Sequence, residues 1–521
     1  MSKQNLIDQL KAAREVSTPL LAVTTPDQPA VAQAIITALN GTTPVIKWDR
    51  VNGFLAGNVK GKEALEAFCK KTGIAANDLP FATAEAHNAF RLAVDLPAHT
   101  VLIAFSLQRW LKEESAGQTI QAILNLRDRF IGDQRTLIGL SPDFSLPVEI
   151  QHDVILLDDP LPGDEGYAEI ITAAHLNAKE GGHKIKMPNG EVVAQGVRAV
   201  RGLSPFEADQ VISMSIASTG MKHLDLQAAW QLKVGAVNKV RGLSMTLDGP
   251  DFADLRGLDN AMSLLNDLWL GPEPPELIVR VDEMDKSFAG LGSHGGPGDN
   301  TGISQDMHQQ FLTAMEDNGW LGALLFGVRG GGKTVLTQSI GKAHGIPTIA
   351  MDTGAMKGGI VGTSEAYVRD AFRTIKSIGG KRVLVLGTCN KMDVFPSELL
   401  RRFKLGVLYF DLLTVEERDA LWPVYLAKYG FPLDTARPDD EGWTGAEIRN
   451  CCELAYKLRR AVATVGATMI VPFTTSNPQL LEALRTQAEG KYLSASYPGA
   501  YRKPVADAVV STGRRMGAQR S

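Results

Sequence analysis

The segment Gly327-Val-Arg-Gly-Gly-Gly-Lys333-Thr334 constrains the fold of this chain more than any other feature. It follows an apolar run with the composition of a buried strand (321–327) and opens a helical pattern (335–344). Glycines at such a junction let main-chain N–H groups turn inward around an anion, and the first turn of the helix adds its partial positive charge. The spacing GxxxxGK[ST] in this context predicts a phosphate-binding loop (P-loop) in an α/β domain.

Each position of this loop has an expected role. Lys333 is expected to reach the β and γ phosphates of a nucleoside triphosphate, and the Thr334 hydroxyl to bind Mg²⁺. The positions expected to surround the phosphates are Gly327, Gly330, Gly331, Gly332, Lys333, Thr334 and Val335. The alternative is a glycine-rich turn with a chance lysine, and the flanking strand and helix argue against it.

A second carboxylate source is needed to hold the metal and polarise a water molecule. Asp282 and Glu283 supply it at the end of an apolar run that begins at Leu277. Asp282 is expected to bind Mg²⁺, and Glu283 to act on the attacking water. Arg280 interrupts the run, either because it faces an interface or because the strand is less buried than usual. The alternative is an acidic strand end that caps the next helix.

Three polar residues farther along are candidates for the same chemistry. Asn390 follows an apolar run (382–388) and is placed to orient the water beside the γ phosphate, although such an Asn is more often a turn residue. Arg401 and Arg402 end a helical segment, where an arginine can stabilise transition-state charge in a neighbour's site. The alternative is a pair of solvated arginines at a helix C-terminus.

The chain is too long, at 521 residues, for one hydrophobic core. Strands alternate with helices near the N-terminus, which predicts a parallel sheet covered on both faces. The run Thr24–Pro29 after the first strand has neither glycine nor lysine, so that domain is not expected to bind nucleotide as a P-loop does. The predicted divisions are an α/β domain (1–175), a helical domain (176–250), an α/β core (251–430), a helical lid (431–475) and a tail (476–521).

Local patterns give five further expectations. Residues 179–191 are expected to form a hairpin or mobile loop, and residues 192–245 helices. Thr414 and Glu417 form a capping-box pattern at the start of a helix, and one helix is expected over 445–462. After Pro472 the periodicity is weak, which predicts an extended or partly disordered arm.

Charge and composition exclude several classes of protein. The net charge of −4 gives no global attraction to nucleic acid, and the four cysteines include no CxxC pair. No apolar run approaches the roughly 20 residues of a membrane span, and the N-terminal residues resemble a charged helix rather than a secretory signal. The sequence predicts a cytoplasmic protein with no membrane role, and nucleic acid is an improbable partner.

Taken together, these residues resemble those of the AAA+ ATPases. The resemblance implies ATP and Mg²⁺ as cofactors, Asn390 as sensor 1, Arg401 and Arg402 as arginine fingers, and the segment 445–448 in the lid. Nearly the whole chain is similar to the AAA ATPase of a conserved hypothetical reading frame in cyanobacteria and algal plastids, through segments such as RGLSPFEADQVI (201–212) and VDEMDKSFAGLGS (281–293). It implies a three-layer α/β fold with a parallel sheet, a helical lid, a degenerate α/β N-terminal domain and a hexamer.

The chain departs from that family in the order of its motifs. In the family the acidic strand (Walker B) follows the P-loop (Walker A), whereas here Asp282 and Glu283 precede Lys333. We expect a permuted strand order, in which residues 276–318 keep the usual place in the sheet. The segment 359–362 aligns with the pore loop of the class but has Ile360 where an aromatic residue is usual, and Met356 and Lys357 are alternative contributors.

These features support three hypotheses for function. The first is a Mg²⁺-dependent ATP hydrolase that works as an oligomer, hexameric by resemblance, and remodels a protein or other macromolecular partner. The second is a scaffold that assembles on binding ATP with little turnover. The third is a nucleic-acid motor or loader, favoured only by Arg502, Arg514 and Arg515 in the tail.

Overall fold

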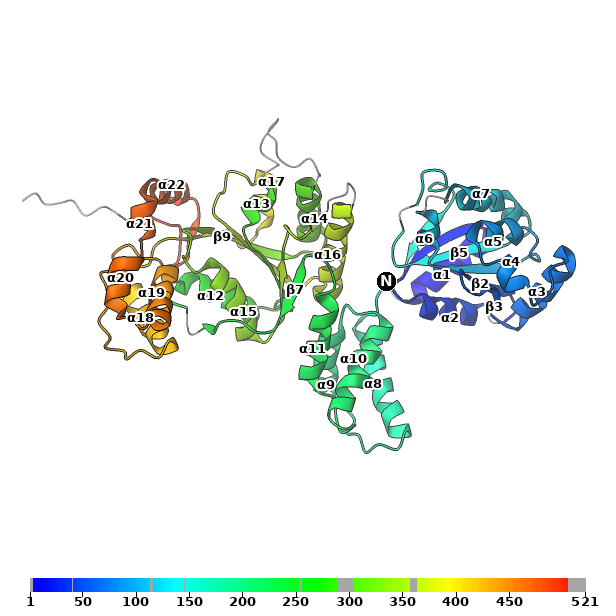
Figure 1. The fold of residues 1–521 in the computed structure, drawn as a ribbon, viewed down its shortest axis with the longest axis horizontal. Helices are drawn as coiled ribbons and strands as arrows, with labels where there is room; N and C mark the ends of the chain where they lie inside the picture. The colour runs from blue at the N-terminus through cyan, green and yellow to red at the C-terminus, as the bar shows by residue number, and fades with distance from the viewer. Residues whose placement is uncertain are drawn as a thin grey trace, which may run out of the picture. The chain divides into compact units, whose positions relative to one another are not determined.

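The computed structural model describes residues 3–39, 41–112, 116–144, 146–252, 255–288, 303–356 and 363–504. It divides into two compact units, Met1–Lys233 (the N-terminal unit) and Val234–Ser521 (the C-terminal unit). Each unit has its own largely parallel sheet with helices against it, which confirms the predicted α/β class (Figure 1). The finer domain boundaries stay predictions.

The sheet of the N-terminal unit has the strand order β3-β2-β4-β5-β1-β6. The five predicted strands are present and parallel, while β3 pairs antiparallel with β2 at the edge and was not predicted. The strands are β1 Leu20–Thr24, β2 Val45–Asp49, β3 Gly53–Ala56, β4 Val101–Phe105, β5 Thr136–Ser141 and β6 Ile155–Asp158. The helices are α1 Lys3–Glu15, α2 Gln28–Ala38, α3 Val59–Thr72, α4 Leu79–Ala82, α5 Ala86–Ala93, α6 Leu107–Leu111 and α7 Ala116–Gly132.

Side chains of this unit bond to one another where a P-loop would follow β1. The buried Thr25 hydroxyl donates to Asp159 Oδ2 at 2.8 Å. The Gln28 side chain accepts from the Ser106 main-chain N–H at 2.8 Å, across the carboxyl ends of β1 and β4. These contacts fill the turn with polar side chains.

The N-terminal unit continues in helices α8 Asp164–Glu180, α9 Gly190–Val200, α10 Pro205–Ser218 and α11 Leu226–Val237, the last of which crosses the boundary between units. Of the two alternatives predicted for residues 179–191, the hairpin does not form, and residues 181–189 are a connection without helix or strand. Helix α8 extends to Glu180, and α9 begins after Asn189, whose side chain accepts from Val192 N. The prediction of helices up to Met245 was wrong at its end. Residues Leu243–Thr246 form strand β7, because they pair antiparallel with residues 348–351, which lie far along the chain.

The sheet of the C-terminal unit has the strand order β13-β12-β9-β11-β8-β10-β7. The acidic strand β8 pairs parallel with β11 on one side and with β10 on the other. It therefore occupies an interior place in the sheet beside the strand that leads to Asn390. The strands that complete the sheet are β8 Leu277–Val281, β9 Leu321–Gly327, β10 Thr348–Met351, β11 Val383–Cys389, β12 Val407–Phe410 and β13 Leu493–Ser494.

Helices cover both faces of this sheet and give the three layers that were predicted (Figure 1). On one face, Leu265 of α12 and Leu336 of α15 pack with strand residues such as Leu325. On the other, Phe311 of α14 and Phe372 of α16 meet edge to face at 4.9 Å. The helices of this core are α12 Asp259–Leu270, α13 Met284–Phe288, α14 Ile303–Asp317, α15 Lys333–His344, α16 Thr363–Gly379 and α17 Ser397–Arg402.

The lid has a hydrophobic core of its own around Trp422 and Trp443. The predicted capping box forms, because Thr414 Oγ1 accepts from Glu417 N and the Glu417 carboxylate accepts from Thr414 N. The helix predicted over 445–462 ends at Leu458, and a second helix begins at Val462. The helices of this lid cluster are α18 Val415–Lys428, which precedes the predicted lid (431–475), α19 Gly445–Leu458 and α20 Val462–Met469.

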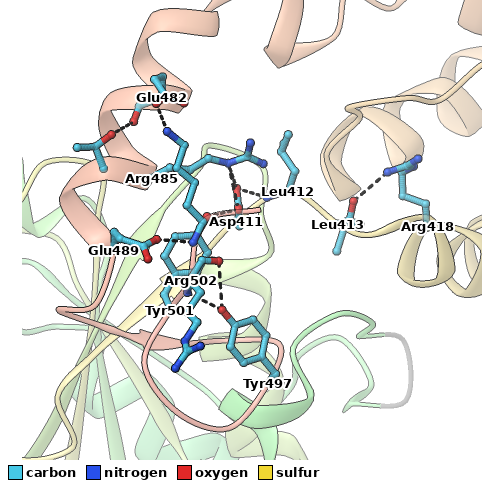
Figure 2. Close-up of polar contacts among 12 residues, drawn as sticks. Asp411, Leu412, Leu413, Arg418, Glu482, Arg485, Glu489, Tyr497, Tyr501 and Arg502 are labelled. Atoms are coloured by element: carbon cyan, nitrogen blue, oxygen red, sulfur yellow. Dashed lines mark hydrogen bonds and ion pairs between the residues drawn. The ribbon is translucent and has the colours of Figure 1, made fainter. Parts of the chain in front are cut away.

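The extended arm predicted after Pro472 was wrong for residues 473–504, while residues 505–521 lie outside the described part. Helices α21 Phe473–Ser476 and α22 Pro478–Ala488 precede β13, which pairs with β12. Asp411, just past β12, accepts from Arg485 Nε at 3.0 Å and from the Tyr501 hydroxyl at 2.6 Å (Figure 2). Buried aromatic contacts and the Asp411 carboxylate hold this segment in place. Neither kind of contact produces a periodic pattern in the sequence, so the sequence did not predict this structure.

Within the described residues, no helix has both the length and the apolar character needed to cross a membrane.

Candidate nucleotide-binding site

A cavity of about 430 Å³ lies at the carboxyl ends of β8, β9 and β11, the edge where ligands of parallel α/β sheets bind. Four segments line it: the P-loop, the ends of β8 and β11, a stretch before α12, and the lid. The lining residues used below are Arg256, Glu283, Lys286, Arg329, Lys333, Thr334, Thr388, Asn390 and Arg449. Of the positions predicted from sequence, Glu283, Asn390 and the P-loop residues 330–335 line this cavity, whereas Asp282 and Gly327 are not among its lining residues.

The backbone of the P-loop depends on glycine at two positions. Gly327 has φ 141°, and a Cβ there would lie 2.1 Å from the Phe410 carbonyl oxygen of β12. Gly330 has φ 81°, and a Cβ there would lie 2.8 Å from Thr444 Oγ1 at the start of the lid helix α19. Both contacts are closer than real Cβ atoms allow, so the loop can fit between β12 and the lid only with glycine.

Lys333 is buried and its ammonium group bonds to the loop itself. Its Nζ donates to the carbonyl oxygens of Gly327 and Val328, each at 2.8 Å. Burial lowers the pKa of Lys333 to about 8, because charge is costly in a site shielded from water. A bound phosphate would replace these neutral acceptors with a charged one and favour the ammonium form.

Asp282 lies beside the P-loop despite its place in the chain. The hydroxyls of Thr334 and Thr388 each approach Asp282 Oδ1 at 3.4 Å. Hydroxyl and carboxylate oxygens are ligands that Mg²⁺ accepts, and no group of three or more His, Cys, Asp or Glu suited to a metal occurs among the described residues. The oxygens present fit a Mg²⁺ ion that is shared with phosphate oxygens, with Thr334 and Asp282 as its protein ligands.

Glu283 follows directly in a strained conformation. Its φ is 50°, which is uncommon for a residue with a side chain and frequent at functional sites. Its main-chain N–H donates to Thr388 Oγ1 at 3.0 Å, and its carboxylate accepts from Lys286 Nζ at 2.5 Å. Thr388 therefore joins both acidic residues to β11. The sequence analysis assigned Thr388 no role, and its place two residues before Asn390 was the available signal.

Asn390 lines the cavity just after β11, where sequence predicted it. A second residue missed by the sequence analysis, Asp285, lies nearby on α13. Its side chain is buried, and this burial raises the pKa of its carboxyl group, while the main-chain N–H of Asn390 acts in the opposite direction. Asp285 thus ties the position of Asn390 to the acidic segment.

The two arginines differ in their surroundings, and neither lines this cavity. Arg402 forms an ion pair with Glu316 of α14. Arg401, at the same end of α17, is exposed. Their predicted action on a neighbouring subunit is not tested by a single chain, but Arg401 is the one accessible to such a neighbour.

Comparison with known proteins agrees with this geometry. Residues 3–158 match the family described as the N-terminal domain of SpoVK-like AAA ATPases. The chain is 21% identical to the uncharacterized AAA domain-containing protein ycf46 of Guillardia theta, over 94% of this chain and 97% of the relative. It is 22% identical to the ycf46 protein of Trieres chinensis, over 85% and 86% of the two chains. These comparisons support an AAA+ ATPase, as the sequence resemblance implied.

The charges that line the cavity suit a polyanion. The cationic side chains that line it are those of Arg256, Lys286, Arg329, Lys333 and Arg449, with Glu283 as the lining carboxylate. Arg449 comes from lid helix α19, whose Ala446 N–H donates to the Gly330 carbonyl at 3.3 Å. The lid of this AAA+ protein therefore contributes a cation to the site and touches the P-loop directly.

The pore-loop prediction cannot be placed in this AAA+ protein, because residues 357–362, including Lys357 and Ile360, lie outside the described part. Met356, the other alternative contributor, is fully buried. Its side chain packs against Gly242, where a Cβ would lie 2.5 Å from Met356 Cγ. In this structure Met356 fills the interior and is not available to grip a substrate.

Proposed function

We propose that this AAA+ protein binds ATP with Mg²⁺ in the cavity and hydrolyses it. The observation that carries the proposal is the approach of Thr334 Oγ1 to Asp282 Oδ1 at 3.4 Å, with Glu283 next in the chain. A P-loop hydroxyl, a metal-binding carboxylate and a second carboxylate that faces the same cavity are the parts that phosphoryl transfer to water needs.

The residues divide the task between them. Lys333 exchanges its carbonyl acceptors for phosphate oxygens, and the loop glycines present main-chain N–H groups. Bound Mg²⁺ would neutralise charge on the phosphates. Glu283 accepts the proton of the attacking water, which requires its carboxylate to leave Lys286, and the Asn390 side chain orients that water.

We further propose that the chain acts as an oligomer, hexameric by analogy with its class, on a protein or other macromolecular partner. Arg401 supports this, because it is exposed and does not line the cavity of its own chain, which leaves it accessible to a neighbour's site. Nucleotide exchange would then move the lid through the contact between Ala446 and Gly330.

One observation favours the scaffold as a second candidate. The Glu283 carboxylate is paired with Lys286, so the residue proposed to act on water is occupied when no nucleotide is bound. A chain that keeps this ion pair after ATP binds would assemble without rapid turnover. The nucleic-acid hypothesis has no comparable support, since Arg514 and Arg515 lie outside the described residues.

The test is steady-state ATP hydrolysis with Mg²⁺ by the full chain, beside Lys333→Ala and Glu283→Gln, with the mass of each measured with and without ATP. The proposal expects turnover in the unmodified chain, loss of ATP binding in Lys333→Ala, and binding without turnover in Glu283→Gln. ATP-dependent assembly with no turnover in the unmodified chain would instead establish the scaffold. No ATP binding at all would overturn both.

A further inference from the structure

Arg280 is a charged residue inside the central part of the C-terminal sheet. It pairs with Ala350 of β10 on one side and with Leu386 of β11 on the other. Its side chain is 15% exposed, and its Nε lies 3.2 Å from Asp282 Oδ2. Of the two alternatives raised by the sequence, the less buried strand does not apply, because the other residues of β8 are buried. The arginine faces the carboxylate two residues on.

The contact is poorly suited to stabilising the fold. Arg280 Nε and Nη1 are buried and neither has a hydrogen-bond partner of good geometry. The free-energy cost of removing water from a guanidinium is offset when it forms a bidentate pair in which both nitrogens donate hydrogen bonds. Arg280 does not form such a pair. Ile278, two residues earlier on the same side of the strand, packs in an apolar core with Leu336. An apolar residue at position 280 would suit that surrounding better.

The two oxygens of the Asp282 carboxylate have different neighbours. Oδ1 faces the hydroxyls of Thr334 and Thr388, whereas Oδ2 faces Arg280. The guanidinium thus leaves the oxygen on the P-loop side available and offsets the charge of the whole carboxylate. A cation this close repels a second cation bound to the same carboxylate, and more strongly than in water because the side chain is largely buried.

We propose that Arg280 sets the metal affinity of the site: it offsets the charge of Asp282, so that a divalent cation is held only together with nucleotide phosphates. This rests on the proposed function in one respect, namely that Asp282 is a metal ligand. The consequence is an order of events. Mg²⁺ enters with the triphosphate and leaves with the product, and the empty protein does not retain it.

The test is a titration of the full chain with Mn²⁺ as a probe for Mg²⁺, followed by electron paramagnetic resonance, without nucleotide and then with ADP. Arg280→Met and Arg280→Gln remove the charge, and Arg280→Lys keeps it as the matched control. Both charge-removing variants should bind Mn²⁺ about tenfold more tightly without nucleotide, with a smaller gain when ADP is present. Arg280→Lys should behave like the unmodified chain.

Unchanged or weaker Mn²⁺ binding in a folded Arg280→Met or Arg280→Gln chain would overturn the proposal. A failure of both to fold would do the same, because it would make Arg280 a structural residue. A gain that persists after adding Asp282→Asn would show that the metal binds elsewhere. None of these readouts requires turnover, so a chain that binds ADP and Mn²⁺ but does not hydrolyse ATP would contradict the proposed function and leave the role of Arg280 decided separately.

Discussion

The hydroxyl of Thr334 lies 3.4 Å from Oδ1 of Asp282, a residue that precedes it by 52 positions in the chain. The usual chain order of these two AAA+ motifs is reversed here, yet the two side chains meet. The reason is that β8 lies between β11 and β10, so its carboxyl end opens on the same edge as the P-loop. Strands pair through main-chain hydrogen bonds, and these bonds do not depend on the order in which the strands follow one another in the chain.

Replacing Thr388 with valine should slow ATP hydrolysis about 10- to 100-fold while leaving ATP affinity nearly unchanged. The Thr388 hydroxyl donates toward Asp282 and accepts from the Glu283 main-chain N–H. Its loss therefore removes a hydrogen bond that holds Glu283 in its strained conformation. The measurement is kcat beside the Kd of a fluorescent ATP analogue. The control is Thr348→Val, which changes a buried threonine at the first residue of β10. Equal kcat in the two variants would contradict the role given to Thr388.

ATP affinity should fall as pH rises above about 8, because burial lowers the pKa of Lys333 to about 8 and the residue must be protonated to hold phosphate. Below pH 8 the ammonium form is already present and binding takes up no proton at this residue. Above it, binding takes up as much as one proton. Calorimetry at pH 9 in buffers of different ionisation enthalpy measures this uptake, which Lys333→Ala should abolish.

The same lysine affects stability in the opposite direction. Its pKa is lowered from 10.5 to about 8 on folding, so between these values the unfolded chain binds more protons. The contribution of Lys333 to the free energy of unfolding should therefore be unfavourable below pH 8 and become less so as pH rises toward 10.5. Comparison with Lys333→Met in urea unfolding between pH 7.5 and 9.5 isolates this contribution.

Arg401→Ala should abolish hydrolysis with little change in stability, since this arginine is exposed at the end of α17. Arg402→Ala should instead destabilise the C-terminal unit, because it leaves Glu316 without its ion-pair partner. Hydrolysis and thermal unfolding of each variant separate the two roles. A mixture of Arg401→Ala with Lys333→Ala chains should recover part of the activity if the arginine acts on a neighbour. Full activity of Arg401→Ala alone would end that interpretation.

Tyr501→Phe should destabilise the C-terminal unit by about 1.5–3 kcal/mol, the usual contribution of a hydrogen bond to a charged acceptor. The Tyr501 hydroxyl donates to Asp411 at 2.6 Å and its ring packs 4.4 Å from that of Tyr409 (Figure 2). Tyr497→Phe is the matched control, since Tyr497 is 40% exposed and its hydroxyl bonds to the main chain of Arg502 rather than to a charged acceptor. Thermal unfolding should show a lower midpoint for Tyr501→Phe only, and equal midpoints would mean that the segment is held without this bond.

The sequence by itself determined the features that are local. The P-loop strand and helix, the strand that ends at Asp282, and the capping box of Thr414 and Glu417 each occupy a few consecutive residues whose spacing is dictated by one strand or one helical turn. The α/β class follows from the same alternation of patterns. The resemblance to AAA+ proteins then implied the roles of Asn390 as sensor 1 and of Arg401 and Arg402 as arginine fingers.

Only the tertiary structure decided which distant residues meet. It placed β8 beside β11, made Thr388 the link between Asp282 and Glu283, and divided Arg402 from Arg401 by an ion pair with α14. It also ordered the segment that ends near Tyr501 by burial against Tyr409. These contacts join residues far apart in the chain, and a local periodic pattern does not indicate which distant residue each of them contacts.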